Sequence, residues 1–216
     1  MYAIKDMPRP VPQEDLNLLA GVETATVGHW RLFGFMDRRI QPLLPKRRVV
    51  ESAVTVAIAG PDSTLLHHAA GMLRPGDIVV VDRLGDDRYA CWGGGATVAV
   101  KAAGAVAGVI DGPCTDLREI EELDFPVWSR GLSSITTRLY DLGGGINISI
   151  SCGGAVVMPG DAILADENGV LVVPREKALA MQEAERNDVN ILKRQKLGEI
   201  SGASAKVMAR LAAMEL

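Results

Sequence analysis

The stretch from Pro75 to Asp116 constrains the fold more than any other part of the sequence. A Pro-Gly turn opens it, and residues 78–81 form an unbroken apolar run, as in strands buried on both faces. Three glycines at 93–95 precede a small, apolar, proline-free segment at 96–103, which predicts a helix. A second apolar run, 106–110, predicts another strand. This order indicates an α/β fold in which strand ends bring functional groups together.

Periodicity elsewhere predicts the remaining elements. We expect strands at 49–59, 126–128, 146–150, 163–165 and 170–173, and helices at 14–22, 64–73, 117–123, 176–196 and 204–214. Asn168 and Gly169, between two apolar runs, predict a hairpin.

These elements fit a single domain spanning residues 1–216. Residues 1–23 would form an arm and one short helix, and the prolines of the arm favour packing on a neighbour or fraying over a regular element. Residues 24–174 would form the core. The C-terminal helices, within 175–216, have a thin apolar face in the first of them, which indicates contacts between subunits.

Composition and charge exclude several classes of protein. The chain has 48% hydrophobic and 23% charged residues, as soluble globular proteins do, and no apolar run of membrane-spanning length. Its net charge of −4 argues against nucleic acid as a partner, because phosphate binding needs a basic face. Cys91, Cys114 and Cys152 are too widely spaced for a disulfide framework or a zinc site. Since no signal peptide opens the chain, we expect a cytoplasmic protein without membrane contacts.

Two features of the central stretch are candidates for a functional site. Gly93, Gly94 and Gly95 at a helix start could present backbone N–H groups to an anion, or simply let the loop pass close to a neighbour. Asp116, in a polar loop, is a candidate ligand for a hard divalent cation. Its alternative role, which the pattern alone favours, is to cap the helix at 117–123.

Other polar residues carry weaker signals. The histidines lack the spacing of metal ligands; they are His29, His67 and His68. Three acids after the first central strand are expected to be solvated: Asp82, Asp86 and Asp87. No Gly-x-Ser-x-Gly or catalytic cysteine signature supports nucleophilic catalysis.

Several segments occur in the order typical of one known family. They are 52–56, 75–82, Trp92-Gly93-Gly94, 101–112, Asp116, Phe125-Pro126-Val127, Ser129-Arg130-Gly131, 153–161, Ala165-Asp166, Gly169 and Val172-Val173-Pro174. Together they resemble the RraA-like family. That family includes class II aldolases acting on 4-hydroxy-4-methyl-2-oxoglutarate and 4-carboxy-4-hydroxy-2-oxoadipate, and the inhibitor of ribonuclease E.

The resemblance implies a three-layer β/β/α sandwich, assembled as trimers or hexamers with active sites at subunit clefts. It implies that Asp116 holds Mg²⁺ or Mn²⁺. It also implies that backbone amides of the glycine turn bind the pyruvate carboxylate; the residues concerned are Gly93, Gly94, Gly95, Ala96 and Thr97. The metal would polarise the 2-keto oxygen and stabilise the enolate formed by retro-aldol cleavage or oxaloacetate decarboxylation.

This sequence departs from the family pattern at two positions. Thr115 stands where the Asp-Gly-x-x-Arg-Asp motif has arginine, and Gly94 stands where the glycine turn usually has glutamate. The missing cation could come from Arg118, one helical turn after Thr115, or from Arg138 or Lys101. A supporting acid from the C-terminal helix would be Glu183 or Glu185.

The resemblance therefore leaves two functions open. The first is a metal-dependent lyase acting on a 2-keto acid, with chemistry altered by Thr115. The second is a non-catalytic regulatory protein resembling the ribonuclease E inhibitor, which the missing arginine favours. A methyltransferase, a label sometimes attached to this family, lacks a nucleotide-binding fingerprint here.

Overall fold

A mixed sheet forms the centre of the molecule in the computed structural model, which describes residues 1–29, 31–175, 210 and 212–213. Four neighbouring strands run parallel: β3 (Val49–Ile58), β4 (Ile78–Asp82), β5 (Ala107–Ile110) and β6 (Val127–Ser129). Short strands extend the edges: β7 (Gly144–Ile146) beside β3, β1 (Tyr2–Ile4) beside β7, and β2 (Gln41–Pro42) beside β6. The parallel strands bring their carboxyl ends to one edge of the sheet.

Strand β4 is buried on both faces, as its apolar run predicts. Val79 and Val81 belong to the core beneath the helices, whereas Ile78 and Val80 belong to a second core on the opposite face. Successive strand side chains point to opposite faces, so both faces of β4 are covered. This double burial explains why the run contains no polar residue.

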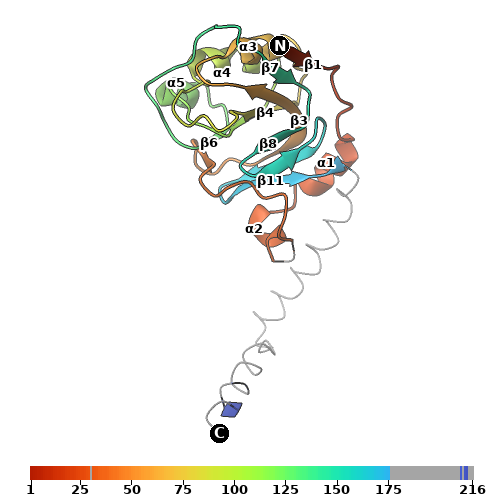
Figure 1. The fold of residues 1–216 in the computed structure, drawn as a ribbon. Helices are drawn as coiled ribbons and strands as arrows, with labels where there is room; N and C mark the ends of the chain where they lie inside the picture. The colour runs from red at the N-terminus through yellow and green to blue at the C-terminus, as the bar shows by residue number, and fades with distance from the viewer. Residues whose placement is uncertain (30, 176–209, 211, 214–216) are drawn as a thin grey trace.

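Three helices cover one face of the sheet: α3 (Thr64–Ala70), α4 (Gly94–Ala102) and α5 (Leu117–Glu122) (Figure 1). Each begins within two residues of its predicted start. Helix α3 ends three residues earlier than predicted, because Gly71 follows it and glycine is a poor helix former. Beneath the loops that lead into α4 and out of α5, the rings of Trp92 and Phe125 stack with centroids 6.3 Å apart.

A second β layer covers the other face of the sheet. It consists of β8 (Ile150–Cys152), β9 (Ala155–Val157), β10 (Ala162–Asp166) and β11 (Gly169–Val173). The first residues of β3 pair with β10, and its later residues pair with β4, so β3 connects the two layers. Helices α1 (Gln13–Leu19) and α2 (Thr24–Val27) pack against β10 and β11. The β/β/α layering and the hairpin at Asn168 and Gly169 are both confirmed.

Two predicted features of the chain are wrong. Residues 146–150 do not form one strand: β7 ends at Ile146, and Asn147 takes a left-handed conformation with φ 55°. Asparagine tolerates that conformation better than most residues, and its side-chain amide donates to the Lys5 carbonyl at 3.3 Å. The N-terminal arm was expected to form no regular element, yet β1 pairs in parallel with β7.

The predicted helices at 176–196 and 204–214 fall outside the described residues, apart from positions 210 and 212–213, which are helical. Glu183 and Glu185 lie in the undescribed part as well. Within the described part of the chain, no helix has the length and apolarity needed to cross a membrane.

Candidate functional site

Asp116 does not cap the helix that it precedes. Its backbone is left-handed, with φ 54° and ψ 43°, and its side chain makes no capping hydrogen bond to α5. Instead, Oδ2 accepts a hydrogen bond from the Gly94 N–H at 3.1 Å. The interpretation that the pattern favoured, a helix cap, is therefore wrong. The left-handed turn directs this exposed carboxylate toward the start of α4.

The glycine turn is shaped around this carboxylate. A Cβ at Gly93 would overlap Oδ2 of Asp116, and a Cβ at Gly94 would overlap the carboxylate of Glu119. At Gly95 nothing lies within 4 Å of the position that a Cβ would take. Glycines 93 and 94 thus admit acidic side chains, and the space above Gly95 is open.

The N–H groups at the start of α4 are not equally available to a ligand. The Gly94 N–H is bound to Asp116, and the Thr97 N–H donates to the Gly93 carbonyl at 3.0 Å. Thr97 is buried, and its hydroxyl accepts from the Trp92 indole at 2.9 Å, so it holds the turn together. In the described part of the chain, the N–H groups of Gly95 and Ala96 have no partner. These two groups are the ones free to bind an anion.

The cations considered as replacements for the family arginine do not converge on Asp116. Thr115 itself lies beside Asp116, with Oγ1 3.3 Å from Oδ1. Lys101 lies in the last turn of α4, at the opposite end from the glycines, and donates to the Leu123 carbonyl. Arg118 is exposed on α5 and has no ion pair among the described residues.

Arg138 is held elsewhere by its backbone. Its N–H donates to the Pro61 carbonyl at 2.8 Å, and its carbonyl accepts from the Ser63 N–H at 2.9 Å. These bonds hold the Arg138 backbone beside the start of α3, and none of the hydrogen bonds or ion pairs in the described structure joins Arg138 to the Asp116 loop.

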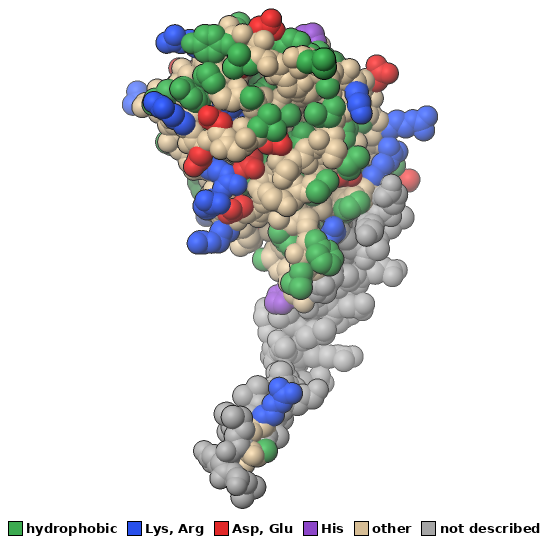
Figure 2. Space-filling view, viewed as in Figure 1, with side chains coloured by type: hydrophobic (Ala, Val, Ile, Leu, Met, Phe, Trp, Pro, Cys, Tyr) green, Lys and Arg blue, Asp and Glu red, His purple; other side chains and the backbone are tan. Residues whose placement is uncertain are grey.

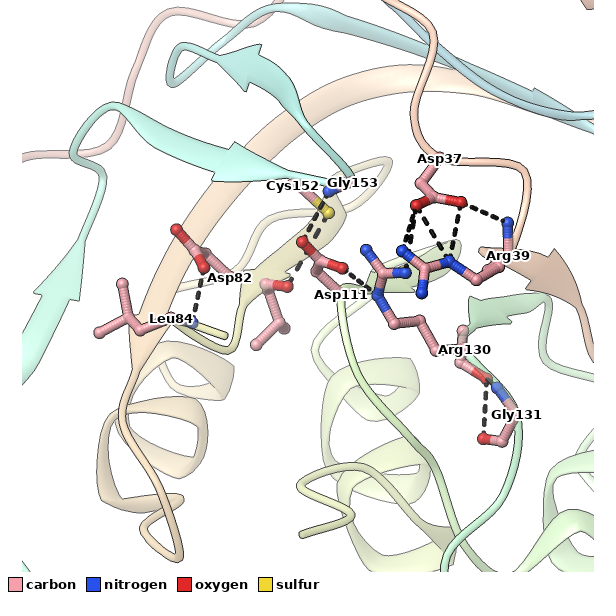
Figure 3. Close-up of polar contacts among 11 residues, drawn as sticks. Asp37, Arg39, Asp82, Leu84, Asp111, Arg130, Gly131, Cys152 and Gly153 are labelled. Carbon is pink, nitrogen blue, oxygen red and sulfur yellow. Dashed lines mark hydrogen bonds and ion pairs between the residues drawn. The ribbon is translucent and has the colours of Figure 1, made fainter. Parts of the chain in front are cut away.

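A second charged cluster lies at the carboxyl ends of β5 and β6 (Figure 3). Asp111 forms an ion pair with Arg130, and its other oxygen accepts from the Gly153 N–H at 2.7 Å. Arg130 also lies 3.5 Å from Asp37, which pairs with Arg39 at 2.6 Å. Hydrogen bonds from Arg39 hold the pKa of the Asp37 carboxyl well below its usual range.

The cluster borders a hollow of about 240 Å³. The side chains lining it include Arg39, Asp86, Asp87, Asp111 and Arg130. No pattern in the sequence assigns a role to Arg130, and its one signal is the Ser-Arg-Gly motif. Because Arg130 joins β5, β6 and the loop that carries Asp37, we assign it the role of fixing the end of the sheet.

The acids after β4 differ in their surroundings. Asp82, expected to be solvated, is buried and accepts from the Leu84 N–H at 2.7 Å and the Ser151 N–H at 3.2 Å. Burial raises the pKa of its carboxyl. Asp86 is half-buried and pairs with the fully buried Arg83 at 3.3 Å. Only the expectation for Asp87, which is exposed, is confirmed among these three.

Nucleophilic catalysis by a thiol finds no support. Cys91, Cys114 and Cys152 are buried and free. Burial raises the pKa of Cys91 to about 11 and that of Cys114 further still, so both thiols are protonated at neutral pH.

Residues 1–29 and 31–175 would offer few ligands to a metal ion at Asp116. The histidines are exposed, and among the described residues no group of three or more His, Cys, Asp or Glu side chains could hold a metal ion. The donor set at the glycine turn consists of carboxylates, with a hydroxyl nearby. Such a set fits a hard cation such as Mg²⁺, which binds one or two carboxylates and keeps several waters.

Comparison with known proteins relates this chain to one family. The model of the RraA-like family, described as Aldolase/RraA, matches residues 24–172. A protein of Halalkalibacterium halodurans named putative 4-hydroxy-4-methyl-2-oxoglutarate aldolase is 34% identical over 152 residues, covering 70% of this chain and 72% of the relative. An uncharacterised protein of Methanocaldococcus jannaschii is 32% identical over 151 residues, covering 68% and 72%.

The fold also matches a solved structure. The crystal structure of Streptomyces coelicolor RraAS2, described as an unusual member of the RNase ES inhibitor RraA protein family, superposes with a TM-score of 0.74. The match covers 89% of this chain and 99% of the other, at 23% sequence identity.

Proposed function

The chain belongs to the RraA-like family, and on this premise we propose that it is a divalent-metal-dependent lyase acting on a 2-keto acid. The reaction would be retro-aldol cleavage, oxaloacetate decarboxylation or both, through a pyruvate enolate. One observation carries the proposal: the Asp116 carboxylate is held against the first turn of α4, beside the free N–H groups of Gly95 and Ala96. A relative named putative 4-hydroxy-4-methyl-2-oxoglutarate aldolase supports the same reaction class.

The chain's own groups would bind and orient the substrate. The free N–H groups of Gly95 and Ala96 point out of the start of α4, where the helix dipole favours negative charge. The carboxylate of a 2-keto acid would bind at such a position. The open space above Gly95 admits it, and the hydrogen bond from Gly94 keeps the Asp116 carboxylate beside the bound acid.

Electrostatics favour a cation at this place. The carboxylates of Asp116 and Glu119 both lie against the glycine turn, and among the described residues neither has an ion-pair partner. An anionic substrate beside them would be repelled without a positive charge between. Mg²⁺ or Mn²⁺ held by Asp116 would supply that charge, polarise the 2-keto oxygen and stabilise the enolate.

Thr115 sets a limit on the rate. A hydroxyl cannot supply the cationic donor that the family arginine offers to the developing enolate. Removing one preorganised donor typically lowers the rate about a hundredfold or more. We therefore expect turnover slower than that of an enzyme with arginine at this position. Metal-dependent release of pyruvate, abolished by Asp116→Ala, tests the proposal.

The same threonine favours a second function. Without the arginine, the protein would act as a regulatory protein that binds a partner, like the ribonuclease E inhibitor, and would show no turnover. Apolar side chains are scattered over the visible face of the globular body (Figure 2). Several on the segment after β6 are exposed, among them Leu132, Ile135, Leu139 and Leu142. Such side chains suit contacts with another protein or with further copies of the chain, and we propose a trimer or hexamer.

Two measurements separate these functions. Binding to purified ribonuclease E without metal-dependent pyruvate release supports the regulatory function. Turnover that requires both metal and Asp116 supports the lyase.

A further inference from the structure

Glu119 occupies the space that a side chain at position 94 would need. A Cβ built on Gly94 would overlap the Glu119 carboxylate and lie 3.0 Å from its Cβ. A Cβ built on Gly93 would overlap the Asp116 carboxylate and lie 2.7 Å from Cγ2 of Thr115. Two consecutive glycines at the start of α4 therefore make room for two acidic side chains from the loop and helix opposite.

The two acidic side chains come from the loop before α5 and from the first turn of that helix. Asp116 directly precedes α5, with a left-handed backbone, and Glu119 follows three residues later. The left-handed backbone at Asp116 costs about 1 kcal/mol for a residue with a Cβ. That conformation turns the carboxylate away from its own helix and toward α4, where Glu119 also lies.

Among the described residues, no basic side chain forms an ion pair with either of these carboxylates. None of the ion pairs in the described part of the chain involves Asp116 or Glu119, and Arg118 between them has no such partner either. The positive end of α4 offers partial compensation, and a hydrogen bond from it reaches Asp116 at 3.1 Å. Like charges held together at one place favour binding of a cation.

We infer that Glu119 is a second carboxylate ligand of the divalent-cation site that Asp116 forms, and that Gly94 is glycine because Glu119 needs its space. The inference rests on the proposed function for the presence of the cation. It adds a residue to the site and explains one departure of this sequence from its family: the carboxylate missing at position 94 is supplied from position 119.

Titration of Mn²⁺ into the full-length protein tests the inference by isothermal calorimetry, without any assay of turnover. We expect Glu119→Gln and Asp116→Asn each to weaken Mn²⁺ binding about tenfold or more. Glu121→Gln is the matched control, because Glu121 is exposed on the same helix and lies two residues from Glu119, a spacing that places the two side chains on different sides of the helix. It should bind Mn²⁺ like the wild type. Circular dichroism and thermal unfolding check that each variant folds.

Changing position 94, alone or together with position 119, provides a second test. Gly94→Ala should weaken Mn²⁺ binding by displacing Glu119, whereas the double variant Gly94→Glu/Glu119→Gly should bind more tightly than Glu119→Gly alone. Wild-type affinity in Glu119→Gln, together with loss in Asp116→Asn, would overturn the inference and leave the proposed function intact. A wild-type protein that binds no Mn²⁺ would overturn both.

Discussion

Gly94 and Asp116, 22 residues apart in the sequence, are joined by a hydrogen bond of 3.1 Å from the Gly94 N–H to Oδ2 of Asp116. This bond ties the start of α4 to the loop before α5, so the glycine turn and the acidic loop form one site. The site depends on the absence of side chains at 93 and 94 as much as on the presence of the carboxylate.

Alanine substitutions in the glycine turn should differ sharply in their effect on stability. Gly95→Ala should raise the free energy of unfolding by about 0.5–1 kcal/mol, because Gly95 is an exposed helical residue with open space around it. Gly94→Ala should give no such gain, since its methyl group would displace Glu119. Urea unfolding of both variants beside the wild type measures the difference. Equal stabilisation by the two substitutions would contradict the packing described here.

The ion pair between Arg130 and Asp111 should contribute to stability. Arg130→Met leaves the largely buried Asp111 carboxylate without its guanidinium partner, and we expect a loss of about 1–3 kcal/mol. Arg39→Met is the matched control: Arg39 is 67% exposed, so the loss should stay below about 1 kcal/mol. Denaturant titration gives both values. A loss for Arg130→Met no larger than that for Arg39→Met would contradict the stabilising role of the pair between Arg130 and Asp111.

Acid should destabilise the protein partly through Asp62. Burial opposes ionisation of this carboxyl, but hydrogen bonds from Thr64, Tyr140 and Leu142 lower its pKa well below the usual range. A lowered pKa in the folded state stabilises the protein above the unfolded value, about 4, and that stabilisation is lost as the pH falls further. Asp62→Ala should cost about 1–3 kcal/mol at neutral pH, because it leaves N–H groups unsatisfied.

The pH dependence of that variant provides the check. Unfolding free energies measured from pH 7 to pH 2 should fall less steeply at acid pH in Asp62→Ala than in the wild type. Asp87→Ala, which removes an exposed carboxylate, should follow the wild-type curve. If the unfolding free energies of wild type and Asp62→Ala fall equally steeply at acid pH, Asp62 does not contribute to the acid sensitivity of the protein.

Thr115→Arg should increase turnover if the site acts on a 2-keto acid. Arginine at this position would lie beside Asp116 and offer the cationic donor that threonine lacks, with an expected gain of about tenfold to a hundredfold in kcat. Thr115→Lys supplies the charge without the bidentate geometry and should gain less. Steady-state rates of pyruvate release measure both. Unchanged or lower rates in both variants would mean that this site does not use a cation at position 115.

Sequence reasoning succeeded where one local pattern determines the structure. The apolar run of β4 predicts double burial, and Asn168-Gly169 predicts the β10–β11 hairpin, because neither depends on distant residues. It failed at Asn147, where a single left-handed residue divides an alternating run into two strands. Alternation indicates which side chains face the core, but it does not reveal that one residue within the run has a left-handed backbone.

The sequence indicates which residues form part of the site, but it does not indicate how their side chains are arranged. The glycine turn and Asp116 stand out in the sequence, but a carboxylate before a helix looks the same whether it caps that helix or turns away from it. Arg130 had no visible role because its partners Asp111 and Asp37 lie 19 and 93 residues away. Glu119 resembles any acidic residue in a first helical turn, and only the structure shows that its carboxylate fills the space beside Gly94.

Pyruvate release tests the central claim most directly. It would be measured from oxaloacetate and from 4-hydroxy-4-methyl-2-oxoglutarate, with Mg²⁺, Mn²⁺ or chelator, using wild type and Asp116→Ala, with metal alone as the blank for uncatalysed decarboxylation. We predict turnover that requires a divalent cation and is lost in Asp116→Ala while the variant stays folded. Wild-type protein that releases no pyruvate above the blank, or turnover unaffected by chelator and by Asp116→Ala, would contradict the account.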